Sequence, residues 1–163
     1  MAADMFLKID GIEGESIDSK HQKEIEVISW SWELNQAGTM HHGQGGGGGK
    51  VTVEDVVVEK WIDAATNGLV GALTTGKHLK KSVLTVRKAG GDAQVEYYKI
   101  EMNDCLITRI SQGENFDDDE RIREKINLNF ATVKVIYQPQ DNQGKPLGGE
   151  RTAGWDMQKN IKL

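Results

Sequence analysis

The feature that most constrains the fold is a change of apolar phase within residues 121–138. Apolar side chains follow one phase of a two-residue period and then the opposite phase. The first set is Ile122, Ile126, Leu128 and Phe130, and the second is Val133, Val135 and Tyr137. Successive side chains of a strand point to opposite faces, so a strand that exchanges its apolar face must pass between two packed surfaces or carry a bulge. This pattern predicts a corner of a closed barrel or sandwich.

Further segments have the period or the composition of strands. They are residues 5–9, 24–36, 51–60, 79–88, 93–102 and 104–111. Residues 89–92, with the sequence Ala-Gly-Gly-Asp, are typical of a hairpin turn, because glycine supplies the positive φ that such turns need.

One segment has helical spacing. Its apolar face is formed by Ile62, Ala65, Leu69, Ala72 and Leu73. Asp63 is the expected N-cap and Gly76 the expected C-terminal stop. We therefore predict a mainly β protein: a small antiparallel β-barrel with one flanking α-helix, formed by a single domain over residues 1–163.

Composition excludes several classes of protein. The 163 residues carry a formal net charge of -5, which disfavours binding to nucleic acid. The single cysteine, Cys105, cannot form an internal disulfide. No apolar run approaches the roughly 18–20 residues of a membrane helix, so we expect no membrane insertion. Residues 1–10 lack a basic segment followed by an apolar one, so we expect no cleavable export signal.

Residues 24–36 contain the first candidate site. Trp30 and Trp32 lie in one phase, and Ser29 and Ser31 lie in the other. Because large aromatic side chains are usually buried, we expect the serines to face solvent or a partner. All four tryptophans of the chain (Trp30, Trp32, Trp61 and Trp155) are expected in the core, the last two at the barrel ends.

The second candidate site is the loop between two predicted strands. It comprises Thr39, Met40, His41, His42, Gly43, Gln44, Gly45, Gly46, Gly47, Gly48, Gly49 and Lys50. A phosphate loop would need glycine at Gln44, Ser or Thr after Lys50, and a following helix. Adjacent histidines in an extended chain point to opposite sides, and no other candidate ligand has metal-site spacing with them. We therefore predict neither a cofactor nor a metal here.

A spacer function also fits this loop poorly, because both flanking segments are strands of one domain. Fixing a backbone costs roughly 1–2 kcal/mol per residue, so ordering residues 37–50 would cost on the order of 15–25 kcal/mol. The few side chains of the loop cannot recover this cost. The loop therefore either stays mobile or is ordered by a partner surface, and long loops of this kind favour a function in assembly.

Charged groups and catalytic motifs add little. Basic residues cluster in and just before the strand predicted at 79–88: Lys77, Lys80, Lys81, Arg87 and Lys88. These residues could contact an acidic partner, but we prefer the interpretation that they protect an edge strand from aggregation. The acidic run 117–120 is interpreted as a solvated loop. Neither a Gly-x-Ser-x-Gly elbow nor a His-Glu-x-x-His motif occurs.

Strings of residues throughout the chain resemble the haemolysin-coregulated protein family, the tube subunit of the bacterial type VI secretion system. They are Met1–Ile9, Gly14–Ser16, Glu24–Trp32, the glycine loop, Gly76–His78, Val86–Gly91, Val95–Tyr98, Asn127–Ala131, Tyr137–Gln140 and Gly154–Asp156. The resemblance implies a β-barrel that forms hexameric rings, which stack into a hollow tube. The resemblance further implies that a contractile sheath drives this tube out of the bacterial cytoplasm. Spike, sheath and baseplate proteins are the partners that it implies.

The resemblance also implies that family members are secreted and that small effector proteins are held in the lumen of the ring. It implies no catalysis. Ser29 and Ser31 are then candidates for lining the lumen, and the glycine loop for contacts between subunits or rings. Two other classes stay open: an enzyme with an unrecognised site around His21 or His78, and a monomeric barrel that binds a carbohydrate or peptide ligand.

Overall fold

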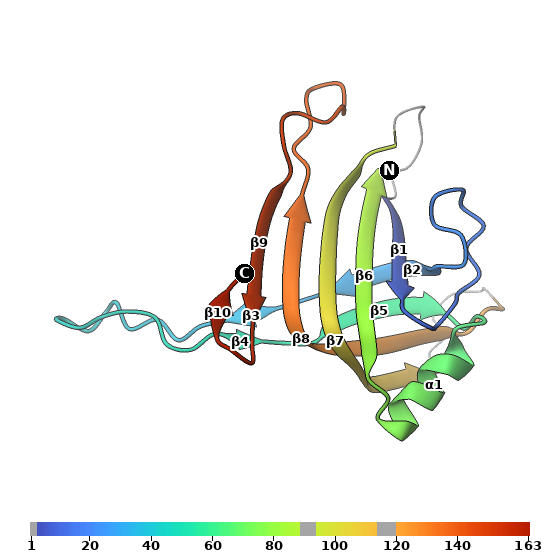
Figure 1. Ribbon diagram of the computed structural model, residues 1–163, viewed down its shortest axis with the longest axis horizontal. Coiled ribbons are helices and arrows are strands. Elements are labelled where there is room, and N and C mark those ends of the chain that lie inside the picture. Colours follow the sequence, from blue (N-terminus) through green and yellow to red (C-terminus); the bar gives the residue numbers. More distant parts are fainter. Residues whose placement is uncertain (1–2, 89–93, 114–119) are drawn as a thin grey trace.

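The computed structural model describes residues 3–88, 94–113 and 120–163 of the chain (Figure 1). In chain order the elements are β1 (Ala3–Ile9), β2 (Ile25–Ser31), β3 (Leu34–Asn35), β4 (Thr52–Val53), β5 (Val56–Trp61), α1 (Thr66–Thr75), β6 (Leu79–Lys88), β7 (Glu96–Gln112), β8 (Arg123–Tyr137), β9 (Arg151–Asp156) and β10 (Ile161–Lys162). The turn predicted at 89–92 and most of the acidic run 117–120 lie outside the described residues.

Antiparallel strands close into a barrel. The order is β8-β5-β2-β1-β6-β7, and β7 pairs again with β8, so six strands form the closed sheet. Strands β9 and β10 extend this sheet beyond β8, and α1 lies against one end of the barrel (Figure 1). The prediction of a mainly β, antiparallel barrel with one flanking helix is confirmed.

Strand β8 forms the predicted corner. Its first part, Arg123–Leu128, pairs with β5, whereas its last part, Thr132–Tyr137, pairs with β9. Buried side chains follow one phase up to Phe130, and the opposite phase begins with the buried Val133. The ends differ from the prediction, because Ile122 and Tyr137 are exposed and Ile136 is buried in place of Tyr137.

Strand β7 is one element where the sequence predicts two. It runs without interruption from Glu96 to Gln112 and pairs with β8 along most of its length. The predicted break falls at Asn103, next to Asp104, whose φ of 52° is in the left-handed region. Aspartate tolerates this conformation better than most residues. Pairing with β6 and β8 continues on both sides of Asp104, so the strand is not interrupted.

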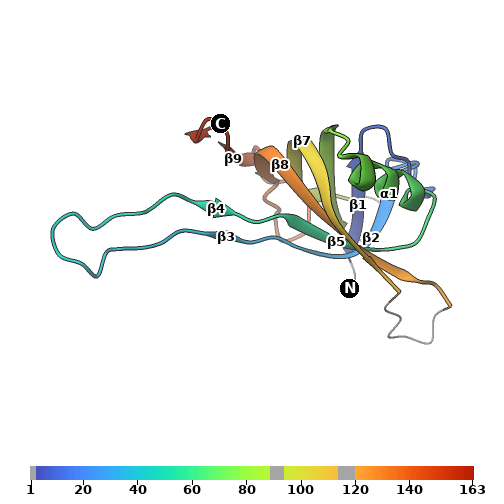
Figure 2. The same ribbon diagram turned by 90° about the horizontal axis from the view of Figure 1, so that it is seen from below.

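The strand predicted at 51–60 is divided in two. Thr52–Val53 (β4) pairs with Leu34–Asn35 (β3) in a separate two-stranded ribbon, and Val56–Trp61 (β5) belongs to the barrel. The ribbon carries the glycine loop away from the barrel (Figure 2). Leu34 lies in this ribbon and is exposed, although it shares the two-residue period of Trp30 and Trp32, which predicts an inward position.

Helix α1 ends as predicted but begins later. Gly76 is the C-cap, with a φ of 62°. The N-cap is Ala65, not Asp63. Asp63 instead caps the preceding turn, because its Oδ1 accepts a hydrogen bond of 2.9 Å from the Ala65 amide. Ala65, Leu69 and Ala72 are buried, which confirms most of the predicted apolar face, whereas Ile62 is exposed.

A buried ion pair joins the start of this helix to the barrel. The Lys60 ammonium lies 2.7 Å from Glu124 Oε2, and both side chains are fully buried. Thr66 of α1 donates to the same carboxylate oxygen at 3.0 Å. Asp63 Oδ1 accepts from the Lys60 ammonium at 2.9 Å. Buried charges need such partners, so these contacts fix the helix on β5 and β8.

Two predicted positions are wrong. Arg87 does not belong to an exposed basic set, since it is 2% exposed and pairs with Asp4 and Asp18. Its strand, β6, lies between β1 and β7 and is not an edge. Trp61 has the outward phase of β5 and lies under the guanidinium of Arg121, at 4.2 Å from the ring centroid. The other three tryptophans pack against the core.

Candidate functional site

The outer face of β2 presents the two serines predicted to face a partner. A bulge between Val27 and Ser29 shifts the alternation of inward and outward side chains in β2. As a result, Trp30 packs inward and both Ser29 and Ser31 are exposed. Ser29 lies opposite Glu59 of β5, and its hydroxyl donates to Glu59 Oε2 at 3.0 Å. The other carboxylate oxygen of Glu59 pairs with Arg123 at 3.0 Å. Ser29 is therefore part of a charged network on the barrel surface.

Ser31 borders a polar hollow of about 460 Å³. The lining residues are Ser31, Trp32, Glu33, Glu54, Asp55, Val57 and Asn127. Two neutral side chains orient the Asp55 carboxylate: Thr108 donates to Oδ2 at 2.5 Å, and Asn129 donates to Oδ1 at 2.8 Å. The surface beside Ser31 is therefore open, polar and rich in carboxylates, a property that periodicity alone does not show.

The glycine loop is a hairpin arm. Thr39 closes its tip with hydrogen bonds to Gly47, from its amide at 3.0 Å and from its hydroxyl at 2.8 Å. Gln36 donates to the Gly49 carbonyl at 2.6 Å nearer the base. The arm extends far from the body of the molecule (Figures 1 and 2). The sequence predicts that the loop is either mobile or ordered by a partner surface, whereas backbone pairing inside the arm supplies part of its order.

Side chains of the arm are almost all exposed. Met40, near the tip, is 76% exposed. His41 and His42 are also exposed, and the residues that the structure describes contain no group of three or more His, Cys, Asp or Glu that could hold a metal. No described helix is long and apolar enough to cross a membrane.

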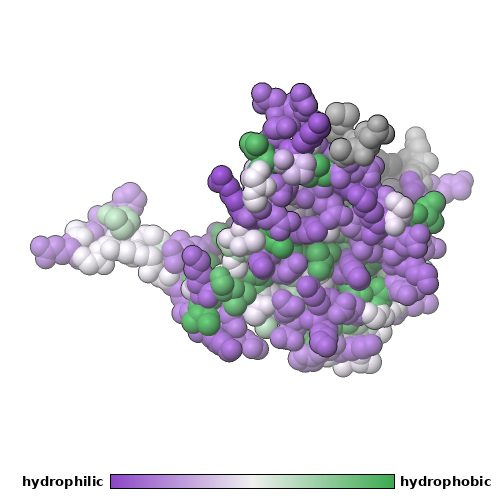
Figure 3. Space-filling view, turned by 45° about the horizontal axis from the view of Figure 1, so that its top comes forward, coloured by the Kyte–Doolittle hydropathy of each residue, from purple (hydrophilic) through white to green (hydrophobic). Residues whose placement is uncertain are grey.

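An apolar hollow of about 360 Å³ lies where the arm meets the body. Its lining includes Leu34 of β3, Val53 of β4, the preceding Val51, and Trp155 of β9. Apolar residues gather at this junction in the space-filling view, whereas the arm beyond it is mostly pale or hydrophilic, apart from one apolar group near its tip (Figure 3). Trp155 therefore borders an open surface as well as the core.

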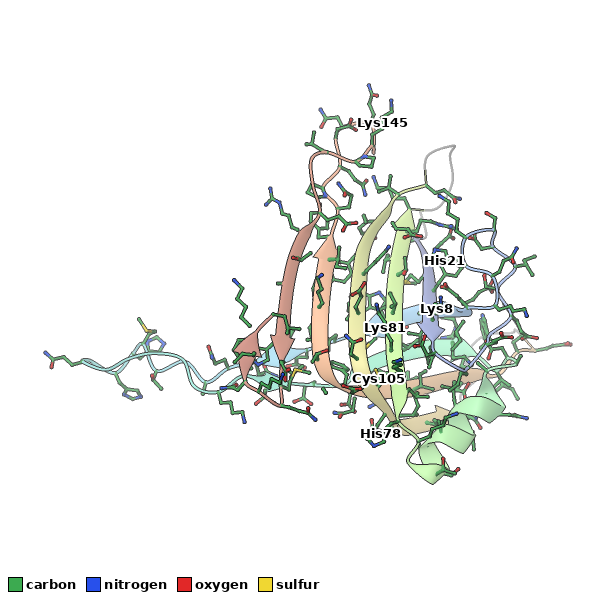
Figure 4. The ribbon with its side chains drawn as sticks, in the orientation of Figure 1. Lys8, His21, His78, Lys81, Cys105 and Lys145 are labelled. Atoms are coloured by element: carbon green, nitrogen blue, oxygen red, sulfur yellow. The ribbon has the colours of Figure 1, made fainter. Side chains whose placement is uncertain are left out.

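The structure places the histidines considered for catalysis far apart. His21 is buried beside β1, and His78 is exposed near α1 (Figure 4). His21 contacts Glu24 and Glu96, whereas His78 lines a separate hollow of about 380 Å³. The two histidines do not form a common site.

Comparison with known proteins identifies the family. The family model described as "Type VI secretion system effector, Hcp" matches residues 6–137. The chain is 46% identical over 162 residues to protein hcp1 of Pseudomonas aeruginosa, covering 99% of both proteins. The chain belongs to the Hcp family. Hcp proteins are structural, non-enzymatic components of the type VI secretion system, so the enzyme alternative is rejected.

Three solved structures share the fold over nearly the whole chain. The crystal structure of Hcp1 from Salmonella typhimurium is 40% identical, with a TM-score of 0.81 over 100% of both chains. A structure described as that of a type six secretion system protein is 30% identical, with a TM-score of 0.92 over 99% of this chain and 100% of that chain. A type VI secretion system effector from Yersinia pestis is 33% identical, with a TM-score of 0.75 over 94% and 99%.

Proposed function

We propose that this Hcp chain, acting as one domain over residues 1–163, is the ring-forming subunit of a type VI inner tube. Six copies form a ring, rings stack into a hollow tube, and the tube leaves the cell with small effectors in its lumen. Sheath, spike and baseplate proteins are the other partners. The proposal rests chiefly on the near-complete match to the Hcp family.

The arm of residues 39–50 is proposed to contact a neighbouring copy. It extends beyond its own barrel and leaves Met40 76% exposed. In an assembly of identical copies, each arm can rest on the next subunit and so repeat the same contact along the stack. The supporting observation is the exposed arm, which its own chain leaves uncovered.

Deletion of Gly43–Gly49 tests the arm. We expect the deletion protein to keep the melting temperature of the barrel and to form rings, because β5 and its barrel pairings do not include the arm. Stacked rings, counted in negative-stain images, should disappear. Gly43→Ala is the matched control, because a Cβ at Gly43 would meet no atom within 4 Å. Unchanged stacking of the deletion protein would reject this function of the arm.

The face with Ser29 and Ser31 is proposed to line the lumen. Small hydroxyl side chains next to an open hollow leave room for cargo, and the nearby carboxylates keep the surface hydrated. Ser31→Gln fills part of this room, whereas Ser31→Ala leaves it open. We expect both proteins to form rings, but only Ser31→Gln to lose the small proteins that co-purify with the ring from its own host.

Mass spectrometry of purified rings quantifies this cargo. Thr152→Gln on β9 is a further control, because Thr152 is exposed outside the six-stranded barrel. If Ser31→Gln rings retain the same small proteins as wild-type rings, Ser31 does not face the cargo. The monomeric ligand-binding barrel is the alternative, and it predicts that no rings form in any of these proteins.

A further inference from the structure

The segment between β1 and β2, residues 11–24, folds back on itself and lies against the barrel. Its two halves are joined by hydrogen bonds from the Gly14 amide to the Lys23 carbonyl at 2.7 Å and from the Ser16 amide to the Glu24 carbonyl at 3.0 Å. The halves are so close that a Cβ on Gly14 would lie 2.5 Å from the Glu24 carbonyl oxygen. The segment is thus a compact flap, which we define as residues 11–24. Ile12 anchors its start in the core, and a few polar side chains attach the remainder to the barrel.

One attachment is His21, which is 6% exposed. Its Nδ1 lies 2.8 Å from Glu24 Oε2, within the flap, and its Nε2 lies 2.7 Å from Glu96 Oε1, on β7. A neutral imidazole has one N–H and can donate to one carboxylate, whereas the imidazolium donates at both nitrogens. The two contacts together therefore fit the protonated ring.

The second attachment is Arg87 of β6. Its guanidinium donates to both carboxylate oxygens of Asp18 in the flap, at 3.1 and 2.6 Å, and to Asp4 of β1 at 3.0 Å. Arginine stays protonated in proteins, so this contact does not depend on a proton near neutral pH. Phe6 lies between the two attachments, stacked on His21 with a centroid distance of 4.3 Å and 5.0 Å from the Arg87 guanidinium carbon.

A lysine beside Glu96 favours the charged form of this carboxylate. The Lys99 ammonium lies 2.8 Å from the second oxygen of Glu96. Burial raises the pKa of Glu96, but hydrogen bonds and charge from Lys99 and His21 outweigh it, and the net pKa is lowered. Because a neutral His21 can donate to only one of its two partners, the other partner, Glu24 or Glu96, would face an unprotonated nitrogen.

We propose that His21 is a proton-dependent latch, which holds residues 11–24 on the barrel while the imidazole is protonated and releases them when the proton is lost. Arg87 and Asp18 then keep one point of the flap in place, so the flap loosens without detaching. The flap also supplies Glu15 and Ser16 to a hollow of about 130 Å³ beside Asp63 and Trp61, and release would widen this hollow.

The first test is the protonation of the ring. In protein labelled with ¹⁵N at its four histidines, long-range ¹H–¹⁵N spectra distinguish protonated from unprotonated ring nitrogens, and His21→Gln assigns the signals. His78 is exposed and supplies the spectrum of a solvated ring. We expect both nitrogens of His21 to carry protons at pH 7. A single-proton tautomer at pH 7 would overturn the proposal.

The second test is hydrogen exchange of the flap at pH 7 and pH 9, expressed as protection factors to remove the chemical pH dependence. We expect protection of residues 11–24 to fall at least about tenfold between these values, while peptides from β6 stay unchanged. Glu96→Gln is the decisive variant, because a glutamine amide can donate to the unprotonated nitrogen of neutral His21. This variant should keep its protection at both pH values.

Equal protection of the wild-type flap at pH 7 and pH 9 would overturn the proposal, as would the same fall in the Glu96→Gln protein. The latch lies within one chain and does not rest on the proposed tube function, so its failure leaves that function untouched.

Discussion

Replacing Lys60 with Met should strongly destabilise the fold. The substitution keeps much of the apolar length of the side chain but removes the ammonium that lies 2.7 Å from Glu124. Two donors to Glu124 then remain among the described contacts, Thr66 at 3.0 Å and Gln112 at 2.8 Å, and both are neutral. A buried charge that loses its partner costs about 3–5 kcal/mol, which lowers the melting temperature of a domain of this size by about 6–20 °C.

Substitution of the other member of the ion pair, Glu124→Gln, should lower the free energy of unfolding by less. The Lys60 ammonium would still contact Asp63 Oδ1 at 2.9 Å and the Trp61 carbonyl at 2.9 Å, so its charge stays compensated. We expect a loss of about 1–3 kcal/mol, the cost of an imperfectly satisfied buried group. The network thus predicts an order of effects as well as their size.

Melting temperatures measured at neutral pH and fixed protein concentration test this order, because assembly makes stability depend on concentration. Lys81→Met is the matched control. Its ammonium lies 3.8 Å from Glu101 and is 43% exposed, and such pairs contribute less than about 1 kcal/mol. The reasoning is refuted if Lys60→Met costs no more than Lys81→Met, or if Glu124→Gln is the more damaging of the two.

Two further substitutions test the loop between β1 and β2. Gly14→Ala places a Cβ 2.5 Å from the Glu24 carbonyl oxygen and should cost about 1–3 kcal/mol in urea unfolding, whereas Gly43→Ala should change stability by less than about 0.5 kcal/mol; equal effects would argue against the close approach. The Arg87 hydrogen bond holds the pKa of Asp18 well below its ordinary value, so their contact stabilises the fold above about pH 4 and is lost as the pH falls below it. Asp18→Asn should therefore flatten the decline of melting temperature between about pH 5 and pH 2, and a wild-type slope in this variant would contradict the pairing.

The sequence predicts the barrel because β8 carries the information in its own side chains. Its buried residues keep one phase up to Phe130, and Val133 is then buried in the opposite phase, although Tyr137 of the second predicted set is exposed. The continuity of β7 is not visible in the same way. The sequence predicts separate strands over residues 93–102 and 104–111, and only the pairing with β8 shows that they form one strand.

The exposure of the two serines of the candidate site is also predictable from local alternation, whereas their contacts are not. Alternation with Trp30 places Ser29 and Ser31 outward, as the structure confirms, but the partner of Ser29 depends on the register between β2 and β5. The burial of Arg87 is also a long-range property. Its partners are Asp4 and Asp18, which lie far away in sequence, so composition favours an exposed position that the fold does not use.

Native mass spectrometry of the purified protein, with negative-stain images of the same sample, tests the central proposal most directly. The account predicts a dominant complex of six 18.0 kDa chains with an open centre. A monomer that persists across micromolar concentrations would contradict the tube subunit and would favour the ligand-binding barrel.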